Sequence, residues 1–297
     1  MNESELKSIL KKPKKISNID YDEISDIISE AIDIFEKEEL LLELNTENDE
    51  NSIVIGDIHG NLESLLKIYE IIKKQDPTYI IFLGDIVDRG EFQLECLIFV
   101  LALKILYPNK YYLLKGNHET VEMNKYYGFY NIFMTEFNQY SQFSEITTLY
   151  NRLPICIIVN NAILCLHGGI PENFEIIEEL KKLHKNKIDS TLPQPIQHAI
   201  FQMMWNDPKE GLARFMDNFR GSGIKYYGYE VFEEFMNKNK LKYLIRAHEV
   251  FPGGYRWFFD NRLLSIFSSE NYRGDYNPNP ASYAIIKNKT VSGEIIE

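Results

Sequence analysis

Residues 52–60 read SIVIGDIHG, and residues 79–90 read YIIFLGDIVDRG. In both segments a short apolar run ends at a glycine that is followed by an aspartate. This is the pattern of a buried strand that leads into a tight polar loop. The pattern recurs in YYLLKGNHE (111–119), AILCLHGG (162–169), KYLIRAHE (242–249) and LLSIFSSENY (263–272). The sequence therefore predicts six strands, each of which ends in a loop that carries polar side chains.

Helical segments are expected between several of these strands, which favours an α/β fold. One example is the apolar face with helical spacing formed by Leu62, Leu65, Leu66, Tyr69 and Ile72. Ligand sites of open α/β sheets lie outside the carboxyl ends of the strands. We therefore expect the six polar loops to converge on one site.

The chain is predicted to form a single domain, because it has no internal repeat and no linker rich in glycine and serine. Residues 1–19 are interpreted as a flexible N-terminal arm that carries a small lysine cluster. Asp20 is predicted to cap a helix, since Glu23 follows three residues later and an apolar stripe follows both. The predicted catalytic domain is therefore residues 20–297.

The predicted strand-end loops hold a set of oxygen and nitrogen ligands without any thiolate, which suits manganese, iron or zinc. The set comprises Asp57, His59, Asp85, Asn117, His167 and His248. Residues two apart on an extended chain point to the same side, so Asp57 and His59 could hold one ion. A carboxylate such as Asp85 can bridge two ions ~3.5–4 Å apart. The other three side chains would then complete the second ion.

Four of the six histidines of the chain fall in these loops, and so dense a clustering favours a metal centre over ordinary turns. His184 and His198 occur in segments with helical character, and we interpret them as ordinary helix residues.

Composition excludes several other classes of protein. A net charge of −12 argues against a nucleic-acid partner, because an acidic surface repels phosphate backbones. The longest apolar stretch, residues 97–107, is too short to span a bilayer, so no membrane association is expected. Three unpaired cysteines within apolar runs and an N-terminus without a signal core predict a cytoplasmic protein, with the nucleus also possible.

The motifs GDIHG, GDIVDRG, GNHE, HGG and RAHE occur in this order, together with YGFY (127–130), WNDP (205–208) and FRGSGIKYYG (219–228). They resemble the phosphoprotein phosphatase family within the calcineurin-like metallophosphoesterases, from about Tyr21 to the C-terminus. The resemblance implies a central β-sandwich of two mixed sheets flanked by helices. It also implies a serine/threonine protein phosphatase in which a hydroxide held by two metal ions attacks the phosphoryl group in line.

The resemblance also assigns roles to individual residues. Asp57, His59 and Asp85 match the ligands of a first metal ion, and the second ion matches Asp85, Asn117, His167 and His248. His118 matches a general acid that Asp88 orients. The residues that match the family's contacts to the substrate phosphate are Arg89, Arg220, Asn117 and Tyr272.

The chain departs from the family pattern at Lys115, Glu270 and Arg273. The last two lie in the SSENY segment, so they affect substrate and inhibitor contacts of that loop and leave the predicted metal ligands in place. The expected partners are phosphoprotein substrates, and the resemblance is also compatible with regulatory subunits. If the acidity of the chain extends to the rim of the site, phosphosites flanked by basic residues should be preferred.

Two other functions are compatible with the same motifs. One is hydrolysis of a small phosphoester, as in a diadenosine-tetraphosphatase-like enzyme. The other is a non-catalytic scaffold that has kept the fold. The motifs YGFY, WNDP, RAHE and SSENY favour the protein phosphatases over the first alternative, and the complete ligand set argues against the second.

Overall fold

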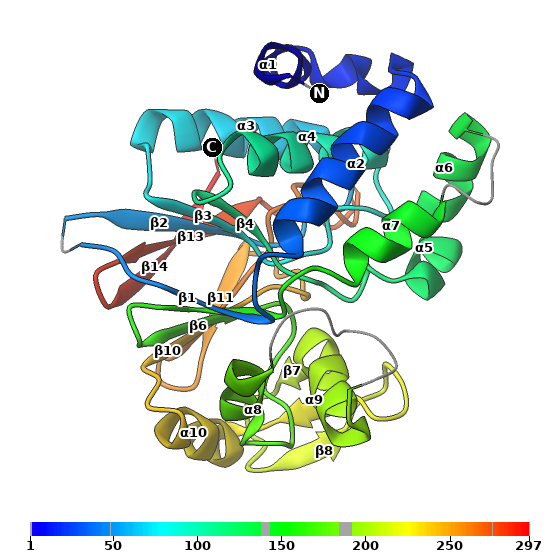
Figure 1. Cartoon of the computed structure of the whole chain (residues 1–297). Coiled ribbons are helices and arrows are strands. Elements are labelled where there is room, and N and C mark those ends of the chain that lie inside the picture. Colours follow the sequence, from blue (N-terminus) through cyan, green and yellow to red (C-terminus); the bar gives the residue numbers. More distant parts are fainter. Residues whose placement is uncertain (1, 48, 138–142, 184–191, 275, 297) are drawn as a thin grey trace.

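The computed structural model describes residues 2–47, 49–137, 143–183, 192–274 and 276–296. Two mixed β-sheets pack against each other, and helices cover the outer side of both (Figure 1). This is the fold class that the sequence predicts. A small third sheet pairs β7 (Asp207–Pro208), β9 (Lys225–Tyr227) and β8 (Phe215–Asp217).

The first large sheet has the strand order β14-β13-β2-β3-β4. Its parallel part consists of β2 (Asn51–Ile55), β3 (Tyr79–Phe82) and β4 (Tyr111–Leu113). These three strands are the first three that the sequence predicts. β13 (Ser282–Lys287) and β14 (Thr290–Ile295) extend the sheet in antiparallel fashion.

The second large sheet has the order β1-β5-β6-β10-β12-β11. The other three predicted strands lie side by side and parallel in it, as β6 (Ile163–Leu166), β10 (Tyr243–Arg246) and β12 (Leu263–Ile266). The flanking strands are β1 (Leu41–Leu44), β5 (Cys156–Val159) and β11 (Tyr255–Phe258). In both sheets, the predicted parallel strands thus end at polar loops.

Alternating side chains of β2 explain why the two sheets pack together. Val54 points into the layer between the sheets, where it joins Cys165 of β6 and Ile245 of β10. Ile53 and Ile55 point to the opposite face and pack under helices. A strand that is apolar on both faces must be covered on both, which a sheet between a helical layer and a second sheet achieves.

Helices from the first half of the chain cover the first sheet, as Figure 1 shows. They are α2 (Tyr21–Phe35), α3 (Leu62–Gln75), α4 (Gln93–Leu106), α5 (Val121–Tyr127), α6 (Phe129–Phe137) and α7 (Phe143–Tyr150). The predicted face of α3 is confirmed, since Leu62, Leu65 and Ile72 are buried. The predicted N-cap of α2 is also confirmed, because the Asp20 carboxylate accepts a hydrogen bond from the backbone of Glu23.

The second sheet is covered by α8 (Ile176–Lys182), α9 (Gln194–Trp205) and α10 (Tyr229–Lys238). His198 lies in α9, as the sequence predicts, and His184 lies outside the described residues. Among the helices that the structure describes, none has the length and apolar composition needed to cross a membrane.

The prediction of a flexible arm at residues 1–19 is wrong. The chain forms α1 (Glu3–Lys11) and the 3₁₀ helix η1 (Pro13–Asn18), and both contact α4. Leu6, Ile9 and Ile16 are buried in the same core as α4. Every residue of α4 from Gln93 to Lys104 is buried, so this helix needs cover on the side that faces away from the sheet. The lysines between these apolar residues hide the pattern in the sequence.

Ile16→Ala should lower the free energy of unfolding by about 2–4 kcal/mol, because Ile16 is fully buried and the change leaves a cavity. Urea denaturation of the full chain measures this change. Lys15→Ala, at the exposed neighbouring position, serves as the control and should stay within about 0.5 kcal/mol of the parent. Equal stability of the two variants would restore the interpretation of a loose arm.

Candidate active site

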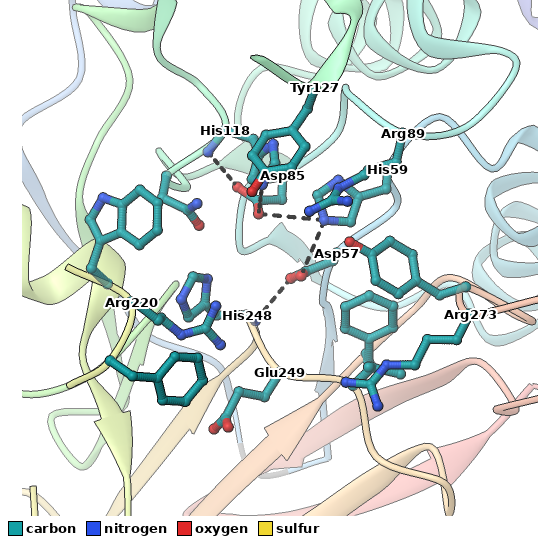
Figure 2. Close-up of a pocket in the computed structure, with 16 residues that line it drawn as sticks. Asp57, His59, Asp85, Arg89, His118, Tyr127, Arg220, His248, Glu249 and Arg273 are labelled. Atoms are coloured by element: carbon teal, nitrogen blue, oxygen red, sulfur yellow. Dashed lines mark hydrogen bonds and ion pairs between the residues drawn. The ribbon is translucent and has the colours of Figure 1, made fainter. Parts of the chain in front are cut away.

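The strand-end loops of both large sheets meet at one edge and line a cavity of about 310 Å³ (Figure 2). Most of the predicted site residues line this cavity: Asp57, His59, Asp85, Arg89, Asn117, His118, Arg220, His248 and Tyr272. The remaining two, His167 and Asp88, are buried and form hydrogen bonds to residues of the lining. The structure therefore brings together every site residue that the sequence predicts.

The backbone places these residues by a route that differs from the sequence prediction. Asp57 and His59 were expected on extended chain, but His59 lies in a turn with a φ of 48°. Asp85 and His248 are also in the left-handed region, at φ values of 54° and 68°. Such conformations are uncommon for residues other than glycine, and they concentrate at functional sites. The positions of the predicted metal ligands thus depend on strained turns rather than on strand alternation.

Glu119 joins the loops after β3 and β4. Its Oε2 accepts hydrogen bonds of 2.8 Å from the backbone amides of both Asp85 and Gly116, and its Oε1 accepts one of 3.0 Å from Ile86. This glutamate belongs to the GNHE motif, whose pattern alone predicts no role for it. Glu119 thereby gives partners to three amides of these loops, and buried donors without partners would be costly.

Asp85 lies at the centre of the cluster. Its Oδ2 is 3.7 Å from His59 Nε2, 3.4 Å from His167 Nε2 and 3.9 Å from His118 Nε2. Its Oδ1 accepts a hydrogen bond of 2.9 Å from the backbone amide of His118. One carboxylate oxygen therefore faces imidazoles that come from both large sheets.

Asp57 lies beside His59 on one side of this centre. The Oδ2 atom of Asp57 is 3.6 Å from His59 Nε2, and its Oδ1 accepts a hydrogen bond of 3.0 Å from the amide of His248. On the other side, His167 Nε2 is 2.8 Å from Asn117 Oδ1 and 3.2 Å from His248 Nδ1. Two groups of donors thus flank Asp85.

Second hydrogen bonds set the tautomers of two of these histidines. The Nδ1 atoms of His59 and His167 lie 2.9 Å and 3.0 Å from the carbonyl oxygens of Val87 and Leu83. A carbonyl only accepts, so each Nδ1 carries the proton and donates. Each Nε2 is thereby left facing Asp85, and a cation bound between the two would take the lone pair of Nε2, as in histidines that bind a metal.

The donor set fits two cations that share Asp85. The potential ligand atoms of Asp85, His167 and His248 lie within 4.8 Å of one another. On the other side of Asp85, His59 Nε2 lies 3.6 Å from Asp57 Oδ2 and 3.7 Å from Asp85 Oδ2. Asp57 and Asp85 are each only 1% exposed. Burial, and then repulsion from Asp85, raises the pKa of Asp57 to about 6. Bound cations would relieve this repulsion, and oxygen and nitrogen donors suit manganese, iron or zinc.

His118 is held differently from the other imidazoles. Its Nδ1 lies 2.7 Å from Asp88 Oδ2, and Asp88 is fixed in turn by the side-chain amide of Asn124 and the backbone amide of Phe129, each at 3.0 Å. Burial opposes protonation of His118, but the negative charges of Asp85 and Asp88 outweigh it and raise its pKa. This imidazole is therefore suited to carry a proton on Nε2, on the side that faces the cavity.

The two predicted phosphate-binding arginines reach the cavity from different parts of the fold (Figure 2). The guanidinium of Arg89 lies 3.7 Å from the ring centre of Tyr127 and 5.9 Å from that of Tyr272. The ring of Tyr272 also stacks on His59, at 5.1 Å between ring centres. These flat contacts hold Arg89 while leaving its donors free for an anion.

Arg220 is held by Asp207, an acid that the sequence pattern did not identify as a site residue. Its Nε donates a hydrogen bond of 2.7 Å to Asp207 Oδ2, and Asp207 Oδ1 accepts one of 2.8 Å from the buried Arg246. Asp207 belongs to the quoted WNDP motif, and Tyr127 belongs to YGFY. The signal for Asp207 in the sequence was its charge within a motif that also contains an aromatic residue.

Comparison with known proteins agrees with this geometry. A family model described as calcineurin-like phosphoesterase matches residues 51–252. The chain belongs to this family. The structure is similar to that of a protein serine/threonine phosphatase from Saccharomyces cerevisiae that has similarity to human phosphatase PP5. The two are 26% identical, the match covers 94% of this chain and 90% of that one, and the TM-score is 0.81. The predicted resemblance to the phosphoprotein phosphatases is thereby confirmed.

More distant matches share the fold alone. One is the cold-active protein-tyrosine phosphatase of a psychrophilic Shewanella species, which is 18% identical. That match covers 89% of this chain and 84% of the other, with a TM-score of 0.59. The fold is therefore found in proteins whose names indicate different phosphorylated residues.

Asp85→Asn should remove most of the bound metal and nearly all activity while the fold is retained. The amide keeps the size of the side chain but loses the charge that two cations would share. Elemental analysis of protein purified in the presence of manganese measures the metal, and circular dichroism checks the fold. Asp76→Asn makes the same chemical change at an exposed position outside the cavity and should have no effect. Two ions per chain in Asp85→Asn would refute the central role of Asp85.

Proposed function

We propose that the chain is a metal-dependent serine/threonine protein phosphatase that hydrolyses phosphoserine and phosphothreonine in proteins. The observation that carries the proposal is the Asp88–His118 pair, which lies beside the shared Asp85 in a cavity that also contains Arg89 and Arg220. A cation site, a proton donor and two guanidinium groups together suit the hydrolysis of a phosphate monoester.

Each group of the cavity has a distinct task in this proposal. Two cations bound around Asp85 would activate a water molecule and neutralise charge on the phosphoryl oxygens. Arg89 and Arg220 bind the remaining phosphoryl oxygens through planar pairs of N–H donors, assisted by Asn117 and Tyr272. His118 Nε2 gives its proton to the leaving oxygen of the serine or threonine, which is otherwise a poor leaving group.

Asp88 orients the acid in this proposal. Its Oδ2 accepts a hydrogen bond from the Nδ1–H of His118, so the other N–H of the imidazolium is on Nε2 and faces the cavity. Its negative charge also favours the protonated imidazole. Since Asn124 and the backbone of Phe129 hold both oxygens of Asp88, the acid is positioned before substrate binds.

The proposed substrate class is supported by the match to the yeast serine/threonine phosphatase, which spans most of both chains. We propose manganese, iron or zinc as the ions, phosphoproteins as substrates, and the cytoplasm or nucleus as the compartment. A small-phosphoester hydrolase and a non-catalytic scaffold are the two alternative functions, and comparison of substrates distinguishes them from a protein phosphatase.

The proposal predicts that the manganese-loaded chain hydrolyses a phosphoserine peptide with a higher kcat/KM than the matching phosphotyrosine peptide or diadenosine tetraphosphate. Release of inorganic phosphate is measured for both peptides. Loss of the dinucleotide is followed by chromatography. Preference for the dinucleotide would identify a small-phosphoester hydrolase, and preference for phosphotyrosine would change the residue specificity. Absence of turnover with all three substrates would identify a scaffold.

His118→Asn should reduce kcat for phosphoserine by roughly 10²–10⁴ while metal content is unchanged, because the leaving alkoxide no longer receives a proton. The loss should be much smaller for p-nitrophenyl phosphate, whose leaving group departs readily without a proton. His198→Asn, at an exposed helical position outside the cavity, is the matched control. Equal losses on both substrates, with chemistry limiting the rate, would take the role of general acid away from His118.

A further inference from the structure

A third arginine, Arg273, lines the cavity in addition to the two phosphate-binding arginines. Figure 2 shows Arg273 and Arg220 on opposite sides of the pocket. Arg273 is exposed, and among the described residues no carboxylate lies within ion-pair distance of its guanidinium. The role assigned to the site so far does not use this side chain.

Three acids near the cavity are paired with other cations. Glu249 Oε2 lies 3.0 Å from the buried Arg246, and Glu270 Oε2 lies 2.8 Å from Lys67. Asp207 is shared between Arg246 and Arg220. Asp275 follows Arg273 in the sequence but lies outside the described residues. Among the residues that the structure describes, Arg273 is thus a positive group at the rim without an ion-pair partner, in a chain of net charge −12.

The position of Arg273 in the lining of the cavity places it near the residues that flank the phosphorylated residue of a bound peptide. The preceding residue, Tyr272, stacks on His59 at the base of the cavity. When a phosphoserine occupies the cavity, its neighbours follow at ~3.3–3.6 Å per residue along an extended peptide. A guanidinium at the rim is then within reach of a side chain one or two positions away, and its planar fork suits a carboxylate or a phosphate.

We propose that Arg273 binds an anionic side chain beside the phosphorylated residue, so that the protein selects acidic phosphopeptides. This inference rests on the proposed protein phosphatase activity. It is opposite to the preference for basic flanks that the net charge alone predicts. The charge close to the bound peptide sets the preference for acidic or basic flanks, because exposed charges are screened beyond ~8 Å at physiological ionic strength.

The test uses the full chain loaded with manganese and four peptides with one phosphoserine. The peptides differ only in the residues that flank the phosphoserine: glutamate, glutamine, lysine, or a non-hydrolysable phosphonate analogue of phosphoserine. The wild type should show a kcat/KM for glutamate roughly two- to fivefold above that for glutamine, as expected for an exposed ion pair, with lysine lowest. The phosphonate peptide distinguishes a second phosphate from a carboxylate as the favoured anion. The preference should shrink in high salt.

Arg273→Glu should reverse this order, so that lysine becomes the best flanking residue. A merely structural role for Arg273 would slow all peptides without reversing their order. Arg214→Glu introduces the same charge change at an exposed position outside the cavity and should keep the wild-type order.

A wild-type preference for lysine, or an unchanged order in Arg273→Glu, would overturn the inference. Equal turnover of all four peptides would overturn it as well and leave the proposed phosphatase activity intact. Failure to hydrolyse any of the peptides, while p-nitrophenyl phosphate is still hydrolysed, would refute the proposed function and this inference together.

Discussion

The site depends on the burial of two carboxylates, Asp57 and Asp85, in one small volume at the edge of the β-sandwich. Two buried negative charges repel each other and lose the solvation of water, so they persist together only where positive groups surround them. The protonated imidazole of His118 supplies part of that compensation, and bound cations would supply the rest. The position of nearly every other polar group near the cavity follows from this requirement.

Asp85 connects the loops physically as well as electrostatically. Its carbonyl oxygen accepts hydrogen bonds from the backbone amides of Ile58 and His59, in the loop after β2. Its own amide donates to Glu119, and its carboxylate accepts from the amide of His118, both in the loop after β4. Left-handed residues in these loops cost about 1–3 kcal/mol each, and such strain persists only where the surroundings over-determine it. The dense hydrogen bonding around Asp85 provides that constraint.

The six strands and the membership of the site could be predicted from the sequence, because both follow from local patterns. Apolar runs that end in polar loops identify strands without any tertiary information, and strand ends in α/β sheets converge. The turn conformation of His59 could not be predicted in this way. It is stabilised by a hydrogen bond from its backbone amide to the carbonyl oxygen of Asp85, in the loop after β3. The burial of Ile16 was hidden for a similar reason. Helix α4, against which Ile16 packs, follows some 80 residues later in the chain, and lysines precede Ile16 in the sequence.

Asp207 shows why some functional residues escape local reasoning. Arg246 and Asp207 are almost fully buried, and a buried ion pair often contributes little to stability because both charges lose their hydration. The consequence of this pair here is geometric. Asp207 Oδ1 accepts a hydrogen bond from Arg246, and Asp207 Oδ2 accepts one from Asn218. The same Oδ2 also accepts a hydrogen bond from Arg220 Nε. Arg220 is therefore fixed along one edge, which leaves its terminal N–H groups directed at the cavity. An arginine ordered in this way loses less conformational entropy when an anion binds than a free one would.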